Sequence, residues 1–207
     1  MKTVAIVEPH YDDAWINLGG LIIRNPETSF KIISVSYNKC NSKNETKLLQ
    51  KFLPNVITKD LHYLGIHWNF IKRIKPENYE KYFLKINKIK SLQEVSSRII
   101  KECEGEGVEM VLMPMGKLHP QHTVVAKIKL PFPVKYYVEW PYFYEEKGAL
   151  KTLKTLAKVE EINISSVINK KINIFSSVYK SQRDLLEMKP KWGPTLARNV
   201  KEIIISQ

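Results

Sequence analysis

Short apolar runs and longer segments with helical spacing alternate along this chain. A β-branched or apolar run that ends at a polar or turn residue is typical of a buried strand. Five runs fit that description, at residues 3–7, 30–37, 108–113, 134–138 and 200–205.

Apolar residues that recur every three or four positions predict the helices. The segments with this spacing are residues 15–23, 45–52, 77–104 with a break around 88–91, and 165–179. Ser165 is a candidate N-cap for the last of them. Gly19 and Gly20 should allow the first helix to approach the sheet closely.

Strands that are separated by helices predict an α/β fold with a mostly parallel sheet covered on both faces. The chain has 207 residues, shows no internal repeat and contains no Gly/Ser-rich linker. We therefore expect a single domain that spans residues 1–207.

The net charge of +12 raises the question of an anionic partner. The chain has 28 lysines and five arginines, spread along its whole length, whereas recognition of phosphates and bases favours arginine. This distribution argues against a nucleic-acid partner, although the net charge alone leaves one open. We expect a solvated lysine surface.

Several patterns bear on where the protein works. No apolar run reaches the length of a membrane span, and no secretory signal precedes Glu8, so we expect a cytoplasmic protein without a membrane span. Cys40 and Cys103 have no CxxC spacing and should be free thiols.

Two polar clusters follow predicted strands. His10, Asp12 and Asp13 come directly after residues 3–7, and His119 and His122 follow residues 108–113. In parallel sheets the ligand site lies beyond the carboxyl ends of the strands, so these clusters should meet if the two strands are neighbours.

Two imidazoles and one carboxylate leave open positions on a zinc or iron ion, which is the arrangement of a catalytic site. A second carboxylate beside the ligands can act as a base towards water, because zinc lowers the pKa of bound water to about 7. These residue types therefore favour hydrolase chemistry.

The segment PHYDDA, followed by GG, resembles the (A/P)HPDDE…GG signature of the LmbE-like, or PIG-L, family of zinc-dependent N-acetylglucosaminyl deacetylases, in its PHxDDA variant. HPQH is similar to the HPDH motif of that family, and residues 170–182 resemble its helix that ends in Y-x-S-Q. The three similarities occur in the family's order and span nearly the whole chain.

The resemblance implies a Rossmann-like three-layer fold and a role for each matching residue. It implies that His10, Asp13 and His122 bind Zn²⁺, with Fe²⁺ as an alternative. It also implies that Asp12 is the general base and that a protonated His119 stabilises the oxyanion. The substrate would then be an amino sugar or glycoconjugate with an N-acetyl group.

The chain departs from the family pattern at three motif positions, where Tyr11 replaces Pro, Ala14 replaces Glu and Gln121 replaces Asp. The arginine and acidic residue that usually precede the family's LG are also absent before Leu64 and Gly65.

Other residues have simpler interpretations. We expect His62 and His67 to be structural, without an acidic partner nearby. Asp12 or Asp13 alone would be read as a helix cap. Residues 136–144 resemble a family segment that borders the pocket, and Glu139 within them is a candidate substrate-binding residue.

Two alternatives to a deacetylase remain. The same site would suit a related hydrolase that acts on another amide or N-acyl group, because the motifs specify the chemistry more closely than the leaving amine. A catalytically degenerate, basic binding protein is the other alternative. The sequence predicts no oligomeric state.

Overall fold

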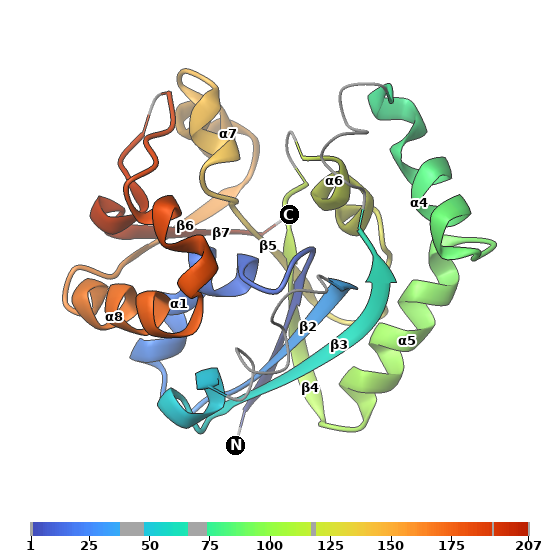
Figure 1. The fold of residues 1–207 in the computed structure, drawn as a ribbon, viewed down its shortest axis with the longest axis horizontal. Coiled ribbons are helices and arrows are strands. Elements are labelled where there is room, and N and C mark those ends of the chain that lie inside the picture. The colour runs from blue at the N-terminus through green and yellow to red at the C-terminus, as the bar shows by residue number, and fades with distance from the viewer. Residues whose placement is uncertain (1, 38–47, 66–73, 117–118, 192, 207) are drawn as a thin grey trace.

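A computed structural model describes residues 2–37, 48–65, 74–116, 119–191 and 193–206 of the chain. Its centre is one seven-stranded sheet with the order β3-β2-β1-β4-β5-β7-β6 (Figure 1). The predicted loop at 38–44, the start of the helix predicted at 45–52, Cys40 and His67 fall outside the described residues.

Five strands of the sheet are parallel: β1 (Thr3–Glu8), β2 (Ser29–Tyr37), β3 (Val56–Leu64), β4 (Val108–Pro114) and β5 (Val134–Tyr137). Strand β7 (Lys201–Ser206) runs antiparallel to β5, and β6 (Lys158–Asn163) runs antiparallel to β7. The prediction of a mostly parallel sheet is confirmed.

Helices cover both faces of this sheet, which completes the predicted three layers (Figure 1). Helices α1 (Asp13–Arg24) and α8 (Ile168–Val178) pack on one face, and their core contains Trp15 and Phe175. On the other face α4 (Tyr79–Asn87), α5 (Leu92–Glu104) and α6 (Pro120–Ala126) bury Phe83, Ile99 and Val124. Helix α7 (Ala149–Leu156) lies beside β6 and β7.

Several predicted boundaries change in the structure. The helix predicted at 77–104 is divided as expected, because Lys88 has a left-handed backbone (φ 54°) that ends α4. Ser165 does not cap α8, whose N-cap is Val167. Strands β3 and β6 and helices α6 and α7 were not predicted.

The glycine pair brings α1 against the polypeptide around α8. A Cβ atom on Gly20 would lie 2.4 Å from Ile164, and one on Gly19 would lie 3.3 Å from Lys171. The close approach is therefore to Ile164 and Lys171, where the sequence had suggested the sheet.

A buried ion pair is built into this contact. Lys171 Nζ lies 2.8 Å from Glu202 Oε1 and donates to the carbonyl of Ile16, at 2.6 Å. Glu202 in turn accepts the backbone N–H groups of Gly20 and Leu21, at 2.7 Å each. These bonds join α1 to α8 and β7, which fixes the helix that carries Asp13.

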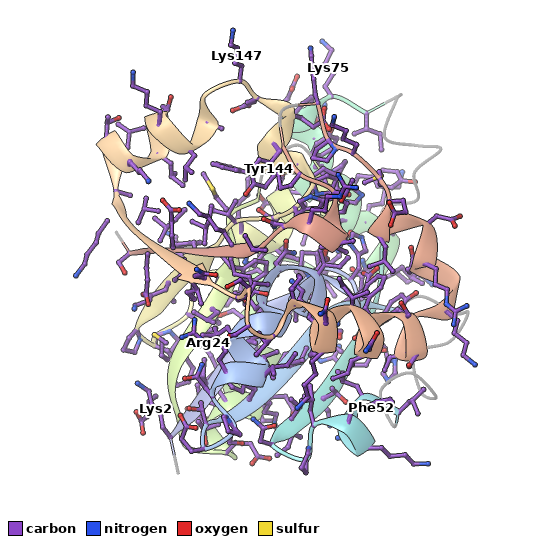
Figure 2. All side chains as sticks on the ribbon, turned by 90° about the vertical axis from the view of Figure 1, so that its left-hand side faces the viewer. Lys2, Arg24, Phe52, Lys75, Tyr144 and Lys147 are labelled. Atoms are coloured by element: carbon purple, nitrogen blue, oxygen red, sulfur yellow. The ribbon has the colours of Figure 1, made fainter. Side chains whose placement is uncertain are left out.

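None of the described helices is long and apolar enough to cross a membrane. Cationic side chains project from opposite ends of the molecule, with Lys75 and Lys147 at one end and Lys2 at the other (Figure 2).

Candidate metal and catalytic site

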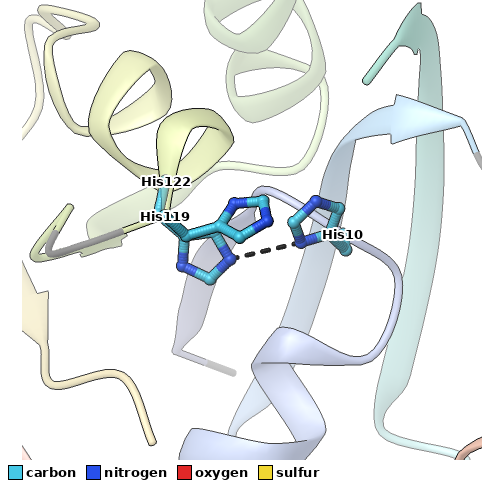
Figure 3. A group of neighbouring side chains, drawn as sticks. All are labelled: His10, His119 and His122. Atoms are coloured by element: carbon cyan, nitrogen blue, oxygen red, sulfur yellow. Dashed lines mark hydrogen bonds between the residues drawn. The ribbon is translucent and has the colours of Figure 1, made fainter. Parts of the chain in front are cut away.

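The two polar clusters meet because β1 and β4 are neighbours in the sheet. His10 lies in the turn between β1 and α1, and His119 and His122 lie at the start of α6 (Figure 3). The ring centroids of His10, His119 and His122 are 4.8–5.1 Å apart. Their nitrogens lie within 4.8 Å of one another, a spacing that could hold a metal ion.

Asp13 completes a tighter group of three donor atoms. Its Oδ2 is 3.0 Å from His10 Nδ1 and 3.3 Å from His122 Nε2, and these two nitrogens are 3.2 Å apart. Ligands at 2.0–2.1 Å around a tetrahedral zinc ion are separated by about 3.3 Å. The three donors therefore have the spacing of three corners of a zinc tetrahedron.

Two possible ligand sets share His10 and His122: one adds Asp13, and the other adds His119. The tetrahedral spacing favours the set with Asp13. His119 belongs to the wider histidine group, but its Nδ1 already accepts the backbone N–H of Gln121, at 3.3 Å. That hydrogen bond places the proton of a neutral ring on Nε2, which is then a donor. His119 thus suits an interaction with a substrate oxygen.

Asp12 and Asp13 are both buried, yet they differ in their partners. Burial and the negative charge of Asp13 raise the pKa of Asp12 to about 7. Burial also opposes ionisation of Asp13, but His122 and His10 outweigh it and hold the pKa of Asp13 well below its usual range. One carboxylate is therefore paired with the histidines, while the other can exchange a proton near neutral pH.

The histidines are also differentiated by their surroundings. Burial and the adjacent rings of His10 and His122 lower the pKa of His119 to about 3, so this ring is neutral. The expected protonated His119 is thereby corrected. Burial opposes protonation of His122 as well, but Asp13 and Glu139 raise its pKa to about 10.

Glu139 lies behind His122 and is 1% exposed. Its Oε1 is 2.5 Å from His122 Nδ1, and its Oε2 accepts the backbone N–H of Gly116, at 2.7 Å. A carboxylate in this position orients a metal-binding imidazole and raises its basicity. The contacts thus differ from the substrate-binding role expected for Glu139, and they make it a support for His122.

Asp12 does not act as a helix cap. Asp12 occupies the N-cap position of α1, but its side chain makes no capping hydrogen bond. Instead the backbone N–H of Ala14 donates to Oε2 of Glu8, at 2.8 Å. Glu8 is 1% exposed, and burial raises the pKa of its carboxyl well above its ordinary value.

Two further residues of the site were not predicted individually. Tyr142 packs its ring against His119 and His122, with centroids 5.5 Å and 5.2 Å apart. Asn17 donates to the carbonyl of Asp13, at 2.8 Å, and accepts the backbone N–H of Trp140, at 2.7 Å. Asn17 thus connects the helix that carries Asp13 to the segment that carries Glu139.

The other histidine within the described residues lies elsewhere. His62 is exposed and has a positive φ of 58°. Its Nδ1 is 3.3 Å from Asp60 Oδ2, so the expectation that it lacks an acidic partner was wrong.

Comparison with solved structures identifies the fold. A deacetylase of the teicoplanin biosynthesis pathway has a TM-score of 0.65 and 12% identity, over 99% of this chain and 97% of that one. The zinc-inhibited form of teicoplanin deacetylase has the same TM-score and coverage at 15% identity. N,N'-diacetylchitobiose deacetylase from Pyrococcus horikoshii has a TM-score of 0.54 and 15% identity, over 87% of this chain and 70% of that one.

These similarities confirm the fold that the motifs predicted, namely that of the LmbE-like deacetylases. The chain matches no family model and no curated protein in sequence.

Proposed function

We propose that this chain, which has the LmbE-like deacetylase fold, is a metal-dependent hydrolase that removes the N-acetyl group from an N-acetylglucosamine-type sugar or its conjugate. The observation that carries this proposal is the triangle of His10, Asp13 and His122 donors, with edges of 3.0–3.3 Å, beside an acid with a pKa of about 7. The deacetylase neighbours support the same chemistry.

His10, Asp13 and His122 would hold the metal ion, with Glu139 orienting His122. Zinc or iron suits two imidazoles and one carboxylate. When bound, the ion supplies Lewis-acid polarisation and lowers the pKa of water.

Asp12 is the proposed general base, because it stands beside the ligands and its side chain makes no capping bond to the helix. It removes a proton from the attacking water and returns that proton to the departing amine. A pKa of about 7 suits both steps, since the group can accept and release a proton near neutral pH.

His119 is the proposed hydrogen-bond donor to the oxyanion. Its ring is neutral, and Gln121 N–H occupies Nδ1, so Nε2–H is the donor. A preorganised donor that faces the developing negative charge typically contributes about 10²–10³ in kcat. The products are acetate and a free amino sugar.

Metal content and turnover, measured on the wild type and three variants, test this proposal. Wild-type protein loaded separately with Zn²⁺ and Fe²⁺ should bind about one ion per chain and release acetate from N-acetylated amino sugars. Asp12→Asn should keep the ion and lose turnover, whereas His122→Ala should lose the ion. His62→Ala is the matched control and should keep both, since this histidine is exposed.

Two outcomes would redirect the interpretation. A metal-loaded protein that hydrolyses other N-acyl amides and ignores amino sugars would make the chain the related amide hydrolase. Absence of metal binding in the wild type, with strongly salt-dependent binding of a polyanion, would favour a basic binding protein.

A further inference from the structure

Glu8 replaces Asp12 as the cap of helix α1. The N-cap residue of a helix ordinarily accepts the backbone N–H of the second or third helical residue. In α1 the second helical residue is Ala14, and its N–H donates to Glu8, at 2.8 Å. One of the two donors that Asp12 could take as a cap is therefore already occupied.

The backbone of Asp12 agrees with this assignment. Capping residues typically have an extended backbone, whereas Asp12 has φ −113° and ψ −12°. Its side chain makes no capping bond. Both observations show that Asp12 holds the cap position without acting as the cap.

The strand below fixes the position of Glu8. The hydroxyl of Ser34, on β2, donates to Glu8 Oε1, at 2.5 Å, and β1 and β2 pair in register at Glu8 and Ser34. Each carboxyl oxygen thus has one partner, one on the sheet and one on the helix. The side chain joins the end of the parallel sheet to the start of α1.

We propose that Glu8 is a positioning residue that keeps Asp12 available for the reaction by taking over its capping bond. Without Glu8, the Ala14 N–H would be free to bond the side chain of Asp12, which occupies the N-cap position and would turn from the site into the cap. The part of this inference that concerns catalysis rests on the proposed function, whereas the exchange of caps does not.

A double-mutant cycle in thermal stability tests the exchange of caps. Glu8→Ala should lower Tm more in an Asp12→Ala background than in the wild-type background, because only the wild-type background retains Asp12 as a second cap for the Ala14 N–H. The difference should be about 2–4 °C for the loss of one cap in a chain of this size. Glu102→Ala, whose side chain pairs with Lys31 and Lys59, is the control and should be additive with Asp12→Ala. Equal losses in both backgrounds would overturn the inference.

The activity arm uses a conservative replacement. Glu8→Gln can still accept from Ala14 and donate to Ser34, so it should keep kcat within about threefold, whereas Glu8→Ala should lower kcat about 10–100-fold with KM and metal content unchanged. An equal loss in both variants would show that charge, and not the cap, is required. If the wild type hydrolyses no N-acetyl amino sugar, the proposed function fails, and the stability cycle still decides the exchange of caps.

Discussion

The clearest test of how the proposed metal ligands are held is Glu139→Gln. The carboxylate of Glu139 accepts from two N–H groups, those of His122 Nδ1 and Gly116. Glutamine offers one acceptor and one NH₂ group, so one of those two N–H groups would face another donor. Fold and packing should survive, because the two side chains have nearly the same shape.

The size of the effect follows from this geometry. Loss of an outer partner of a metal-binding histidine typically weakens metal binding about 10–100-fold. At about 1.4 kcal/mol per tenfold change, this corresponds to about 1.4–2.7 kcal/mol of metal-binding free energy. The buried N–H group left without an acceptor should also lower the free energy of unfolding by about 1–3 kcal/mol.

Competition with a chromophoric chelator would measure the zinc affinity of both proteins. Glu160→Gln is the matched control, because Glu160 is 59% exposed and pairs only at 3.6 Å with Lys135. It should leave the affinity unchanged. A folded Glu139→Gln protein that binds zinc within about twofold of wild type would refute the role assigned to Glu139.

Three further predictions address other parts of the site and its support. Among the described residues the Tyr142 hydroxyl has no hydrogen-bond partner, so Tyr142→Phe should leave Tm unchanged. It should lower kcat/KM about 2–10-fold if that hydroxyl contacts the substrate, and unchanged kinetics would exclude Tyr142 from the reaction. Burial raises the pKa of the Glu8 carboxyl well above 4.5, so the stability that its proton provides is present below pH 4.5 and is lost as the pH rises towards the folded pKa. Over that rise in pH, Glu8→Gln should therefore gain stability relative to the wild type, measured by urea unfolding of metal-free, chelated samples. A stability difference that does not change with pH would contradict this. Gly20→Ala should cost about 1–3 kcal/mol by urea unfolding, because its Cβ would meet Ile164 at 2.4 Å, whereas Gly105→Ala has no contact closer than 3.7 Å and should be neutral.

The strands that were predicted differ physically from those that were missed. Strand β1 is buried at every position, and such strands have continuous apolar runs. Strand β3 is an edge strand whose register shifts between Ser34 and Ser36 of β2, so its buried positions change phase midway and no simple alternation appears. Strand β6, at the other edge, is largely polar and has no fully buried residue.

The site residues divide in the same way. The meeting of the two clusters could be predicted because each follows a strand, and parallel strands bring their carboxyl ends together. The choice of His10, Asp13 and His122 as metal ligands came from the family resemblance. Glu8 and Glu139 acquire their roles from bonds to Ala14 and His122, which depend on how α1 and the segment after β5 pack. An isolated glutamate in the sequence carries no sign of such a partner.

The division of labour between two adjacent aspartates follows from where α1 begins. Asp13 is the first helical residue, and its carboxylate accepts the His10 backbone N–H, at 2.8 Å, and lies beside both imidazoles. Asp12 precedes the helix, and Glu8 occupies the N–H that would otherwise attract it. The neighbouring negative charge of Asp13 then raises the pKa of Asp12 to about 7, while the histidines hold that of Asp13 low. Two identical side chains one residue apart thereby acquire the surroundings that the proposed function needs for a ligand and a base, because the helix start and Glu8 give them opposite partners.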